Sequence, residues 1–303
     1  MARQKNKAAS VRQLLLDRSR KNSESFQFLL TRYGLERLLY RLSLSEYEPY
    51  FVLKGAMLFP IWGINGHRPT MDADLLGFGE STEAHVREVF QELCHLDVED
   101  DGLLFAPENI RVEVIREEME YGGVRVKLIA ELDKARIPLQ IDIGYGDAVT
   151  PPALEIEYPT LLDMPAPHLR VYPRESVIAE KFHAMVLLGM GNSRIKDMYD
   201  IWVLARLFEY SGSVLAQALA RTFERRQTAI PQQTPLALTE EFYADAAKQA
   251  LWRSFIKRNN LIEQDVELEE VVQTIGRLLL PVCEALNKGV DFPLFWPMGG
   301  PWR

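Results

Sequence analysis

The sequence predicts an α+β protein in which a mixed sheet flanked by helices is followed by an all-helical C-terminal domain. Segments rich in β-forming residues lie between residues 70 and 158, whereas from Arg174 onward apolar residues recur at helical spacing. Prolines are concentrated between residues 150 and 173, which is typical of irregular or edge structure. We therefore expect two domains, an α/β domain with N-terminal helices over residues 1–173 and a helical domain over 174–303.

Helices are expected at several places in the first domain. Residues 8–42 carry leucines and aromatic residues three and four apart. The segment Tyr50–Trp62 is apolar enough for a buried helix, and Ser81-Thr82 forms a capped start for a helix that runs to about Leu96.

The strands are expected from alternation and β-rich composition. One strand carries Asp72-Ala73-Asp74, and four others cover Ile110–Arg116, Gly123–Leu132, Pro138–Tyr145 and Leu154–Tyr158. In the second domain, helical spacing covers Ser176–Leu188, Lys196–Glu209, Ser213–Arg226, Thr239–Arg258 and Leu268–Asn287. The tail Phe292–Arg303, rich in proline and tryptophan, is expected to fold back over apolar surface without forming a helix.

Composition excludes several classes of protein. The net charge of −8 argues against a surface that is basic enough throughout to hold nucleic acid without specificity. Cys94 and Cys283 are far apart and show no metal-binding spacing, so neither a zinc site nor a disulfide framework is expected. The chain has no apolar run long enough for a membrane span and no secretory signal, so we expect a cytoplasmic protein without membrane partners.

Three local groups of basic residues could still contact nucleic acid, although a solvated helix face is the more common explanation for any single group. They are an N-terminal cluster (Arg3, Lys5, Lys7, Arg12, Arg18, Arg20, Lys21), the run Arg221–Arg226, and Arg253 with Lys257 and Arg258.

The most informative feature is the pair Asp72 and Asp74. Successive side chains of a strand alternate between faces, so the two carboxylates share one face about 7 Å apart and can converge on one divalent cation. Asp142 alternates with Ile141 and Ile143 in a further strand and provides a third carboxylate. Taken alone, an Asp-x-Asp pair also fits a solvated edge strand.

Three carboxylates from two strands are what two-metal phosphoryl or nucleotidyl transfer requires. Mg²⁺, or Mn²⁺ in its place, takes one or two protein carboxylates together with phosphate oxygens and waters. Gly55 precedes the Asp-x-Asp strand, and a residue without a side chain lets backbone amides approach a phosphate closely. The sequence therefore predicts metal-dependent chemistry on a nucleotide.

Five motifs occur in order: KGAMLFP, HRPTMDADL, QIDIG, ESVIAEKFHAM and RIKDMYDIW. Together they resemble the AbiEii/AbiGii toxin family of nucleotidyltransferases, within the polymerase-β-like nucleotidyltransferase superfamily, over roughly residues 50–205. One departure is that the family commonly has Gly-Gly or Gly-Ser followed by Thr or another small residue, whereas this chain has Gly55-Ala56-Met57.

The resemblance implies a nucleotidyltransferase-type sheet and assigns roles to residues. Lys181 matches the family's helix lysine, which contacts the nucleotide phosphates, and Asp197 and Asp200 match its acidic KDxxD element. Asp197 and Asp200 are three residues apart, so they share a helix face. A helix hairpin would bring both to Lys181. For each of these three residues a purely structural ion pair is the alternative.

The combined prediction is a metal-dependent nucleotidyltransferase. Asp72 and Asp74 bind Mg²⁺, and Asp142 completes the metal site or acts as base. The nucleotide is held by Gly55, the Ala56 backbone, Arg68 and Lys181, where a guanidinium can hold phosphate bidentately.

The resemblance further implies the toxin of a toxin–antitoxin or phage-defence system, an RNA acceptor such as the 3′ end of tRNA, and a cognate antitoxin as partner. Two alternatives remain open at this point. One is a nucleotidyltransferase that modifies a protein or a small molecule such as an aminoglycoside, and the other is an inactive nucleotide-binding regulator, which the Ala56-Met57 departure suggests.

Overall fold

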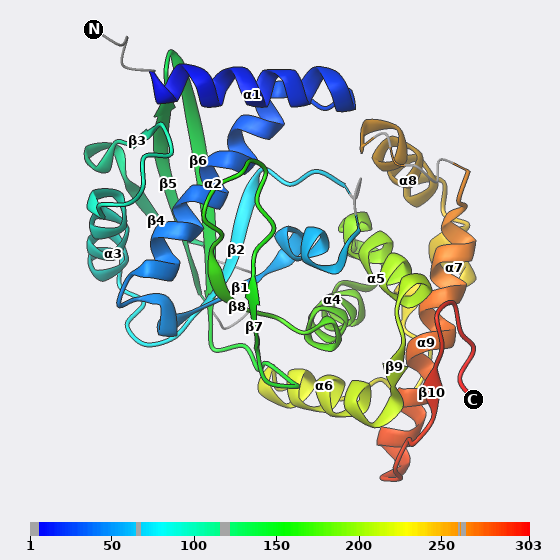
Figure 1. Cartoon of the computed structure of the whole chain (residues 1–303). Helices are drawn as coiled ribbons and strands as arrows, with labels where there is room; N and C mark the ends of the chain where they lie inside the picture. The colour runs from blue at the N-terminus through cyan, green and yellow to red at the C-terminus, as the bar shows by residue number, and fades with distance from the viewer. Residues whose placement is uncertain (1–5, 65–67, 116–121, 260, 262–264) are drawn as a thin grey trace, which may run out of the picture. The chain divides into compact units, whose positions relative to one another are not determined.

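The computed structural model describes residues 6–64, 68–115, 122–259, 261 and 265–303, and the chain divides into two compact units (Figure 1). The sheet unit comprises Met1–Gly146 and Leu154–Val171, and the helical unit comprises Asp147–Ala153 and Tyr172–Arg303. Arg3 and Lys5 of the N-terminal basic cluster, and Arg116 at the end of a predicted strand, lie outside the described residues.

The sheet unit is built on one eight-stranded mixed sheet, which confirms the predicted fold class. Its order is β3-β5-β6-β2-β1-β8-β7, with β4 paired to β5. The strands are β1 (Phe51–Lys54), β2 (Asp72–Gly77), β3 (Leu103–Phe105), β4 (Arg111–Ile115), β5 (Gly123–Leu132), β6 (Ala135–Tyr145), β7 (Leu154–Glu157) and β8 (His168–Val171).

The centre of the sheet brings together strands that are distant in sequence. β2 lies between β1, to which it is antiparallel, and β6, to which it is parallel. β5 and β6 form a long antiparallel hairpin that ends at the turn between Leu132 and Ala135. The Asp-x-Asp strand is therefore a central strand, which excludes the solvated edge strand considered from the sequence.

Among its described residues, this unit has three α-helices: α1 (Lys7–Asn22), α2 (Phe26–Leu44) and α3 (Glu83–His95). α2 packs against β6 and β8 (Figure 1), and α3 contacts α2, β4 and β5. The Thr82 side chain accepts a hydrogen bond from the His85 amide, so the predicted cap of α3 is confirmed. Three short 3₁₀ helices complete the unit: η1 (Glu48–Tyr50), η2 (Gly55–Trp62) and η3 (Pro107–Asn109).

The prediction of one buried helix over Tyr50–Trp62 is wrong. Phe51–Lys54 forms strand β1, and a 3₁₀ helix follows over Gly55–Trp62. Phe51, Val52 and Leu53 are all buried because β1 is a central strand, and a continuous apolar run of that kind cannot be told from a buried helix by periodicity. The change of structure falls at Gly55, which has a φ of +75°.

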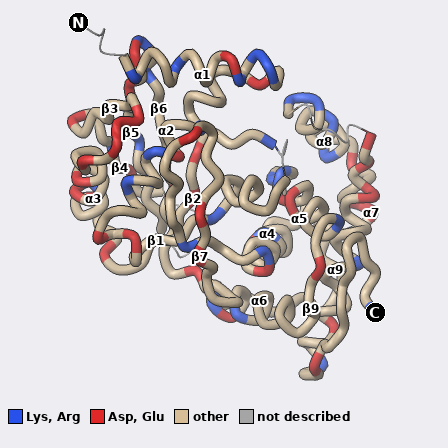
Figure 2. The backbone as a smooth tube through the Cα atoms, viewed as in Figure 1, with Lys and Arg blue, Asp and Glu red and all other residues tan. Residues whose placement is uncertain are grey.

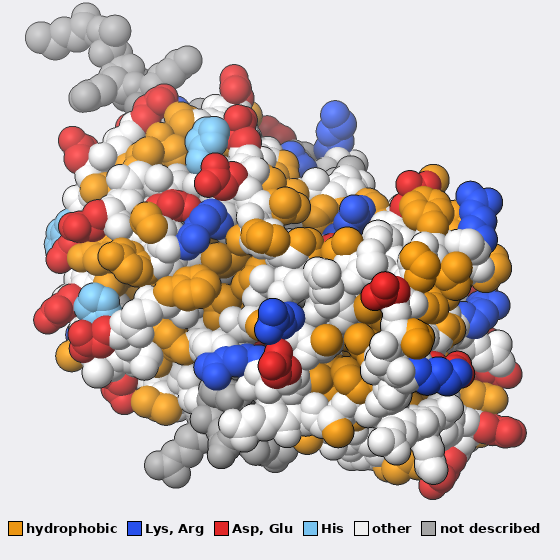
Figure 3. All heavy atoms as spheres, turned by 90° about the horizontal axis from the view of Figure 1, so that it is seen from below, with side chains coloured by type: hydrophobic (Ala, Val, Ile, Leu, Met, Phe, Trp, Pro, Cys, Tyr) orange, Lys and Arg blue, Asp and Glu red, His pale blue; other side chains and the backbone are white. Residues whose placement is uncertain are grey.

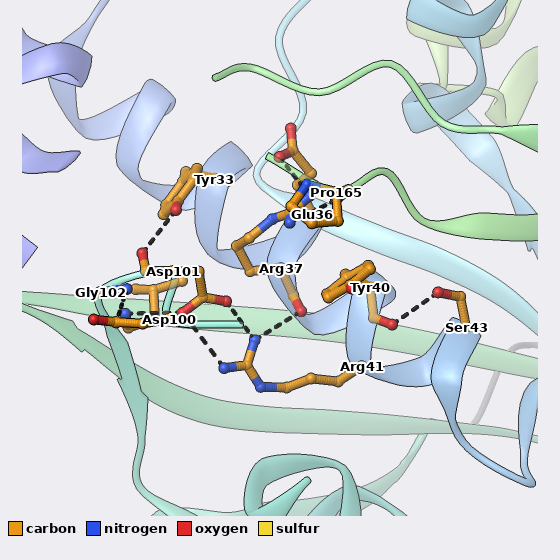
Figure 4. Close-up of polar contacts among 11 residues, drawn as sticks. Tyr33, Glu36, Arg37, Tyr40, Arg41, Ser43, Asp100, Asp101, Gly102 and Pro165 are labelled. Atoms are coloured by element: carbon orange, nitrogen blue, oxygen red, sulfur yellow. Dashed lines mark hydrogen bonds and ion pairs between the residues drawn. The ribbon is translucent and has the colours of Figure 1, made fainter. Parts of the chain in front are cut away.

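Buried charges fasten α2 to two loops of the sheet unit (Figure 4). Arg41 forms an ion pair with Asp101 at 2.7 Å, and the Tyr33 hydroxyl donates to the Asp101 carbonyl. Arg37 donates to the carbonyl of Pro165 at 2.8 Å and pairs with Glu36. These buried ion pairs and hydrogen bonds fix the position of α2 on the sheet.

The helical unit contains six helices among its described residues. They are α4 (Arg174–Leu188), α5 (Ile195–Leu207), α6 (Gly212–Arg225), α7 (Glu240–Tyr243), α8 (Ala246–Asn259) and α9 (Leu268–Lys288). The short elements are η4 (Gly189–Gly191), η5 (Leu236–Leu238) and the strand pair β9 (Tyr210–Ser211) and β10 (Phe295–Trp296). α9 is the most strongly amphipathic of them and packs against α5 and α6.

Two details of this unit bear on the sequence predictions. The single helix expected over Thr239–Arg258 is wrong, since α7 ends at Tyr243 and α8 begins at Ala246. Asp245 lies between them, and its carboxylate accepts a hydrogen bond from the Lys248 amide, so it caps a new helix. The tail folds back as expected: Trp296 is buried and donates to the Ala205 carbonyl.

Within the described residues, none of the helices is both long and apolar enough to cross a membrane.

Candidate active site

Asp72 and Asp74 lie on one face of strand β2. Both side chains are half-buried, whereas Ala73 and Leu75, which alternate with them, are buried. The sequence pattern therefore gives the predicted geometry, with two carboxylates side by side on a central strand.

Asp142 lies beside this pair on the neighbouring strand. In the parallel register of β2 and β6, Asp142 is the partner of Asp74, and Ile141 and Ile143 on either side of it are buried. The three predicted carboxylates thus belong to one face of two adjacent central strands.

Arg125, which the sequence analysis missed, holds Asp142. It lies opposite Asp142 in the register of β5 and β6, and its Nε and Nη2 atoms donate to Oδ1 and Oδ2, each at 2.7 Å. These hydrogen bonds raise the pKa of Arg125. The alternation of Arg125 with buried Val124 and Val126 was the only signal for it in the sequence.

Gly55 lies directly against the Asp74 carboxylate. A β-carbon placed on Gly55 would be 1.9 Å from Asp74 Oδ2, and the backbone there has a φ of +75°. No other residue type fits both conditions, since a side chain would clash and the left-handed conformation disfavours one. The predicted role of Gly55 as a close backbone approach therefore has a geometric basis, and Ala56, the first residue after it, is buried.

The segment before β2 contributes a hydroxyl. Thr70 Oγ1 donates to Asp72 Oδ1 at 2.5 Å, which fixes that carboxylate. Arg68, two residues earlier, is half-buried and lines the same cavity as Thr70. Thr70 thus places a hydroxyl beside the Asp-x-Asp pair.

This face offers two carboxylates, those of Asp72 and Asp74, as ligands for a hard divalent cation. Among the residues that the structure describes, no group of three or more His, Cys, Asp or Glu side chains is arranged to hold a metal ion. Asp142 is turned to Arg125, which leaves Asp72 and Asp74 as the adjacent pair. Two carboxylates are the number that Mg²⁺ uses when substrate phosphates and waters complete its coordination.

Lys181, Asp197 and Asp200 form a second group, in the helical unit. α4 carries Lys181, α5 carries both carboxylates, and η4 joins the two helices. Lys181 Nζ is 2.5 Å from Asp197 Oδ1 and 2.8 Å from Asp200 Oδ2. The expected helix hairpin therefore does bring these three residues together.

This second group is buried and its charges are compensated. The side chains of Asp197 and Asp200 are 1% and 0% exposed, and that of Lys181 is 12% exposed. Burial alone raises the pKa of Asp197, but Lys181 and Arg194, whose Nε is 2.8 Å from Asp197 Oδ2, more than offset it and the net pKa is lowered. The Asp197 carboxylate is therefore charged at neutral pH because cations accompany it.

His183, on the same helix as Lys181, is buried beside another ion pair. Its Nε2 lies 3.0 Å from Thr228 Oγ1, and Arg226, which pairs with Asp147 at 2.8 Å, approaches its Nδ1. Burial, with a further contribution from Arg226, lowers the pKa of His183 to about 4, so the imidazole is neutral at pH 7.

Comparisons with known proteins show the family to which the chain belongs. Residues 37–274, most of the chain, match the family model described as nucleotidyl transferase AbiEii toxin, type IV toxin–antitoxin system. No curated protein matches the chain.

Two crystal structures of Helicobacter pylori proteins are similar in fold. JHP933 is 17% identical, with a TM-score of 0.51 over 88% of this chain and 95% of its own. A provisionally assigned nucleotidyltransferase is also 17% identical, with a TM-score of 0.49 over 88% of this chain and 100% of its own.

Proposed function

Because the chain belongs to the AbiEii family of nucleotidyltransferase toxins of type IV toxin–antitoxin systems, we propose that it transfers a nucleotide from an NTP to RNA at the Asp72–Asp74 face of its sheet. The family implies an NTP substrate and an antitoxin partner. The metal, the acceptor and the residue roles are the proposed part.

One observation carries the proposal. Asp72 and Asp74 lie side by side on a central strand. Gly55 lies so close to the Asp74 carboxylate that only a residue without a side chain fits there. Glycine adopts this left-handed conformation without strain and has no side chain, so it is often found where backbone must come close to a ligand.

Each residue has a role in this proposal. Asp72 and Asp74 hold Mg²⁺ or Mn²⁺, with Asp142 as the third carboxylate of the site. The backbone at Gly55 and Ala56, together with Arg68, contacts the phosphates of the donor. Lys181 also contacts the phosphates, and Asp197 and Asp200 position its ammonium group.

The bound cation would supply charge stabilisation at the phosphates, where negative charge develops during transfer. In the transfer, a hydroxyl oxygen of the acceptor forms a bond to the α-phosphorus of the NTP. The bond from the α-phosphorus to the bridging oxygen breaks, pyrophosphate leaves, and the hydroxyl proton passes to water. Thr70 and Arg125 keep the carboxylates of Asp72 and Asp142 in place during this exchange.

The direct test incubates the full chain and Mg²⁺ with each α-labelled NTP and either total RNA, total protein or a mixture of small cationic metabolites and aminoglycosides. We expect label in RNA, sensitive to ribonuclease and absent when EDTA is added. Label in protein or small molecules would replace the acceptor in the proposal, and NTP binding without transfer to any of the three would contradict it.

A further inference from the structure

A cavity of about 490 Å³ lies in the sheet unit. Its walls come from α1, α2, η2 and the segment that precedes β2. Three of its lining residues are arginines, namely Arg18, Arg32 and Arg68, and Glu24 is the one acidic residue among the described lining residues. A chain with a net charge of −8 has here a local concentration of positive charge.

Two of these guanidinium groups each have a buried N–H group without an acceptor among the described residues. Arg18 Nε and Arg32 Nε are buried, and no described residue accepts a hydrogen bond from either. Buried polar groups in proteins are nearly always hydrogen-bonded, and in the wall of this cavity a bound molecule can supply the acceptor. Phosphate oxygens are the acceptors that best match the geometry of a guanidinium.

The arginine side of the cavity is held in place by a loop. Arg18 Nη1 donates to the Leu161 carbonyl at 2.8 Å, and the Leu161 amide donates to the carboxylate of Glu36 on α2 at 2.7 Å. On the opposite wall, the Tyr158 hydroxyl donates to the Met57 carbonyl. The cavity is therefore formed by fixed elements and does not depend on loose side chains.

The remaining wall is apolar and includes an aromatic ring. Phe28 is half-buried, and Met57 and Pro60 contribute apolar surface beside it. A half-exposed ring next to arginines is the combination that proteins use for single-stranded nucleic acid, where bases stack and guanidinium groups hold phosphates. The lining therefore suits a nucleotide better than a free anion or an apolar molecule.

The cavity adjoins the candidate active site through two residues. Thr70 lines the cavity and donates its hydroxyl to Asp72. Ala56 also lines it and follows Gly55, which lies against Asp74. A molecule in the cavity consequently lies next to the carboxylates that are proposed to hold the metal.

The positions of the cavity residues in the sequence favour the acceptor over the NTP as the molecule bound there. Arg18, Phe28 and Arg32 precede residue 37, where the match to the family model begins. Handling of the NTP is common to nucleotidyltransferases and is expected within the matched region, whereas a wall outside it suits the molecule that differs between family members.

We propose that this cavity binds the phosphate-bearing nucleotide at the 3′ end of a single-stranded RNA acceptor, with its phosphate on Arg18 and Arg32 and its base against Phe28. The inference rests on the proposed function for the identity of the acceptor, but binding can be measured without transfer. On the face in Figure 3 the charge is mixed, because Lys and Arg side chains are interspersed with Asp, Glu and hydrophobic side chains, so that face has no continuous basic surface.

The test compares Arg32→Gln with Arg20→Gln in the full chain. Arg32 makes no hydrogen bond through Nε to a described residue, and its charge acts on buried Glu36, so each variant is checked for folding. Arg20 is an exposed arginine of α1 that does not line the cavity. The probe is a fluorescein-labelled single-stranded oligoribonucleotide with a free 3′ hydroxyl, followed by fluorescence anisotropy without NTP or metal.

We expect Arg32→Gln to raise the Kd for this RNA about tenfold or more, as loss of a charge-assisted phosphate contact does. The slope of log K against log salt should become shallower by about 0.7 for one lost contact. Phe28→Leu should weaken binding by a similar factor with an unchanged salt slope, since it removes stacking and leaves the charges. Arg20→Gln should match the wild type in both quantities.

Steady-state transfer provides the second readout. Arg32→Gln should raise KM for RNA and leave KM for the NTP unchanged. Equal RNA affinity of Arg32→Gln and Arg20→Gln would overturn the proposal, and so would a rise in KM for the NTP alone, which would assign the cavity to the donor. If no variant transfers nucleotide to RNA but RNA binding still depends on Arg32, the cavity proposal stands and the proposed function fails.

Thermal unfolding of each variant shows whether it is folded. If Arg32→Gln is unstable, Arg32→Lys, which keeps the charge, should recover most of the affinity.

Discussion

The sheet unit and the helical unit each hold a group of charged residues that the sequence singled out, and the two groups differ in how their charge is balanced. On the sheet, Asp72 and Asp74 are half-buried neighbours, and Arg125 makes its paired hydrogen bonds to Asp142. In the helical unit, Lys181 lies between Asp197 and Asp200, and all three are largely buried. The sheet group remains partly accessible, whereas the helical group is buried and its charges compensate one another.

The difference in burial between the two groups indicates which motif residues serve binding and which serve stability. Two adjacent carboxylates that remain partly accessible can be reached by a divalent cation, which takes carboxylate oxygens as ligands. A buried ion pair is compensated internally, and removing one member leaves an uncompensated charge in a region of low polarity. Substitutions in the two groups should therefore fail in different ways, one in activity and the other in stability.

The largest effect is expected for Asp74→Asn. The change removes a charge that would hold the metal while keeping the size of the side chain, so kcat for nucleotide transfer should fall about a thousandfold. The free energy of unfolding, measured in urea, should stay within about 1 kcal/mol of the wild type, because the residue is half-buried and faces the site. Asp97→Asn, a change in the loop after α3, is the control. Transfer at the wild-type rate by Asp74→Asn would remove Asp74 from the metal site.

Lys181→Met should instead act mainly on stability. It leaves Asp197 and Asp200 buried without their shared cation, which is expected to cost about 3–5 kcal/mol in the free energy of unfolding. The triple variant Lys181→Met, Asp197→Asn, Asp200→Asn removes all three charges and should recover most of that loss.

The triple variant also separates structure from function. If it is stable and its KM for the NTP is raised, Lys181 contacts the phosphates as proposed. Recovery of stability together with a wild-type KM would mean that the Lys181 group serves only to hold α4 against α5.

Gly55→Ala tests the close approach to Asp74 with a matched control. The new β-carbon would lie 1.9 Å from Asp74 Oδ2, so the carboxylate must move, and we expect about a hundredfold loss of transfer. Gly63 has a similar φ of +73° but no atom within 4 Å of its β-carbon position. Gly63→Ala should therefore show the same backbone cost of about 1–2 kcal/mol without the loss of activity. Equal activity of the two variants would show that the position of the Asp74 carboxylate is not critical.

The smallest effect concerns His183 and the pH dependence of stability. An unfolded histidine has a pKa of about 6.5, whereas burial and Arg226 lower the folded value to about 4. Between these values the unfolded chain binds a proton that the folded chain does not. The stability that comes from neutral His183 is thus complete above pH 6.5 and is lost as the pH falls toward 4.

One such proton corresponds to a slope of up to about 1.4 kcal/mol per pH unit. Urea unfolding between pH 7 and pH 5 should show a smaller slope in His183→Gln, which can still hydrogen-bond Thr228, than in the wild type. His95→Gln, at an exposed position on α3, is the control, and an unchanged slope in His183→Gln would show that His183 is not the group responsible.

Much of the fold was predictable because its patterns are local. The alternation of Asp72 with Ala73 and of Asp142 with Ile141 and Ile143 gave both the strands and the shared face. The pairing of Asp142 with Arg125 was not predictable, since it depends on which strands become neighbours and in what register. The strand at Phe51–Lys54 was missed for a related reason, because only its place between β2 and β8 distinguishes it from a buried helix.

The cavity was the part of the site furthest from prediction. Arg18 belonged to a predicted basic cluster, but other members of that cluster, such as Arg20, are exposed on the same helix and do not line the cavity. Lys and Arg also gather on α8 (Figure 2), where Arg253, Lys257 and Arg258 are exposed. A charge run in the sequence does not show which of its members will face a cavity, because that depends on how α1 and α2 pack.

Binding of Mn²⁺ to the full chain in the presence of a non-hydrolysable NTP analogue, followed by electron paramagnetic resonance, tests the central claim most directly. The account predicts that the wild type binds Mn²⁺, that Asp72→Asn and Asp74→Asn each lose at least tenfold in affinity, and that the folded triple variant at Lys181, Asp197 and Asp200 retains it. Undiminished Mn²⁺ affinity in both single variants would contradict the assignment of the metal to the Asp72–Asp74 face.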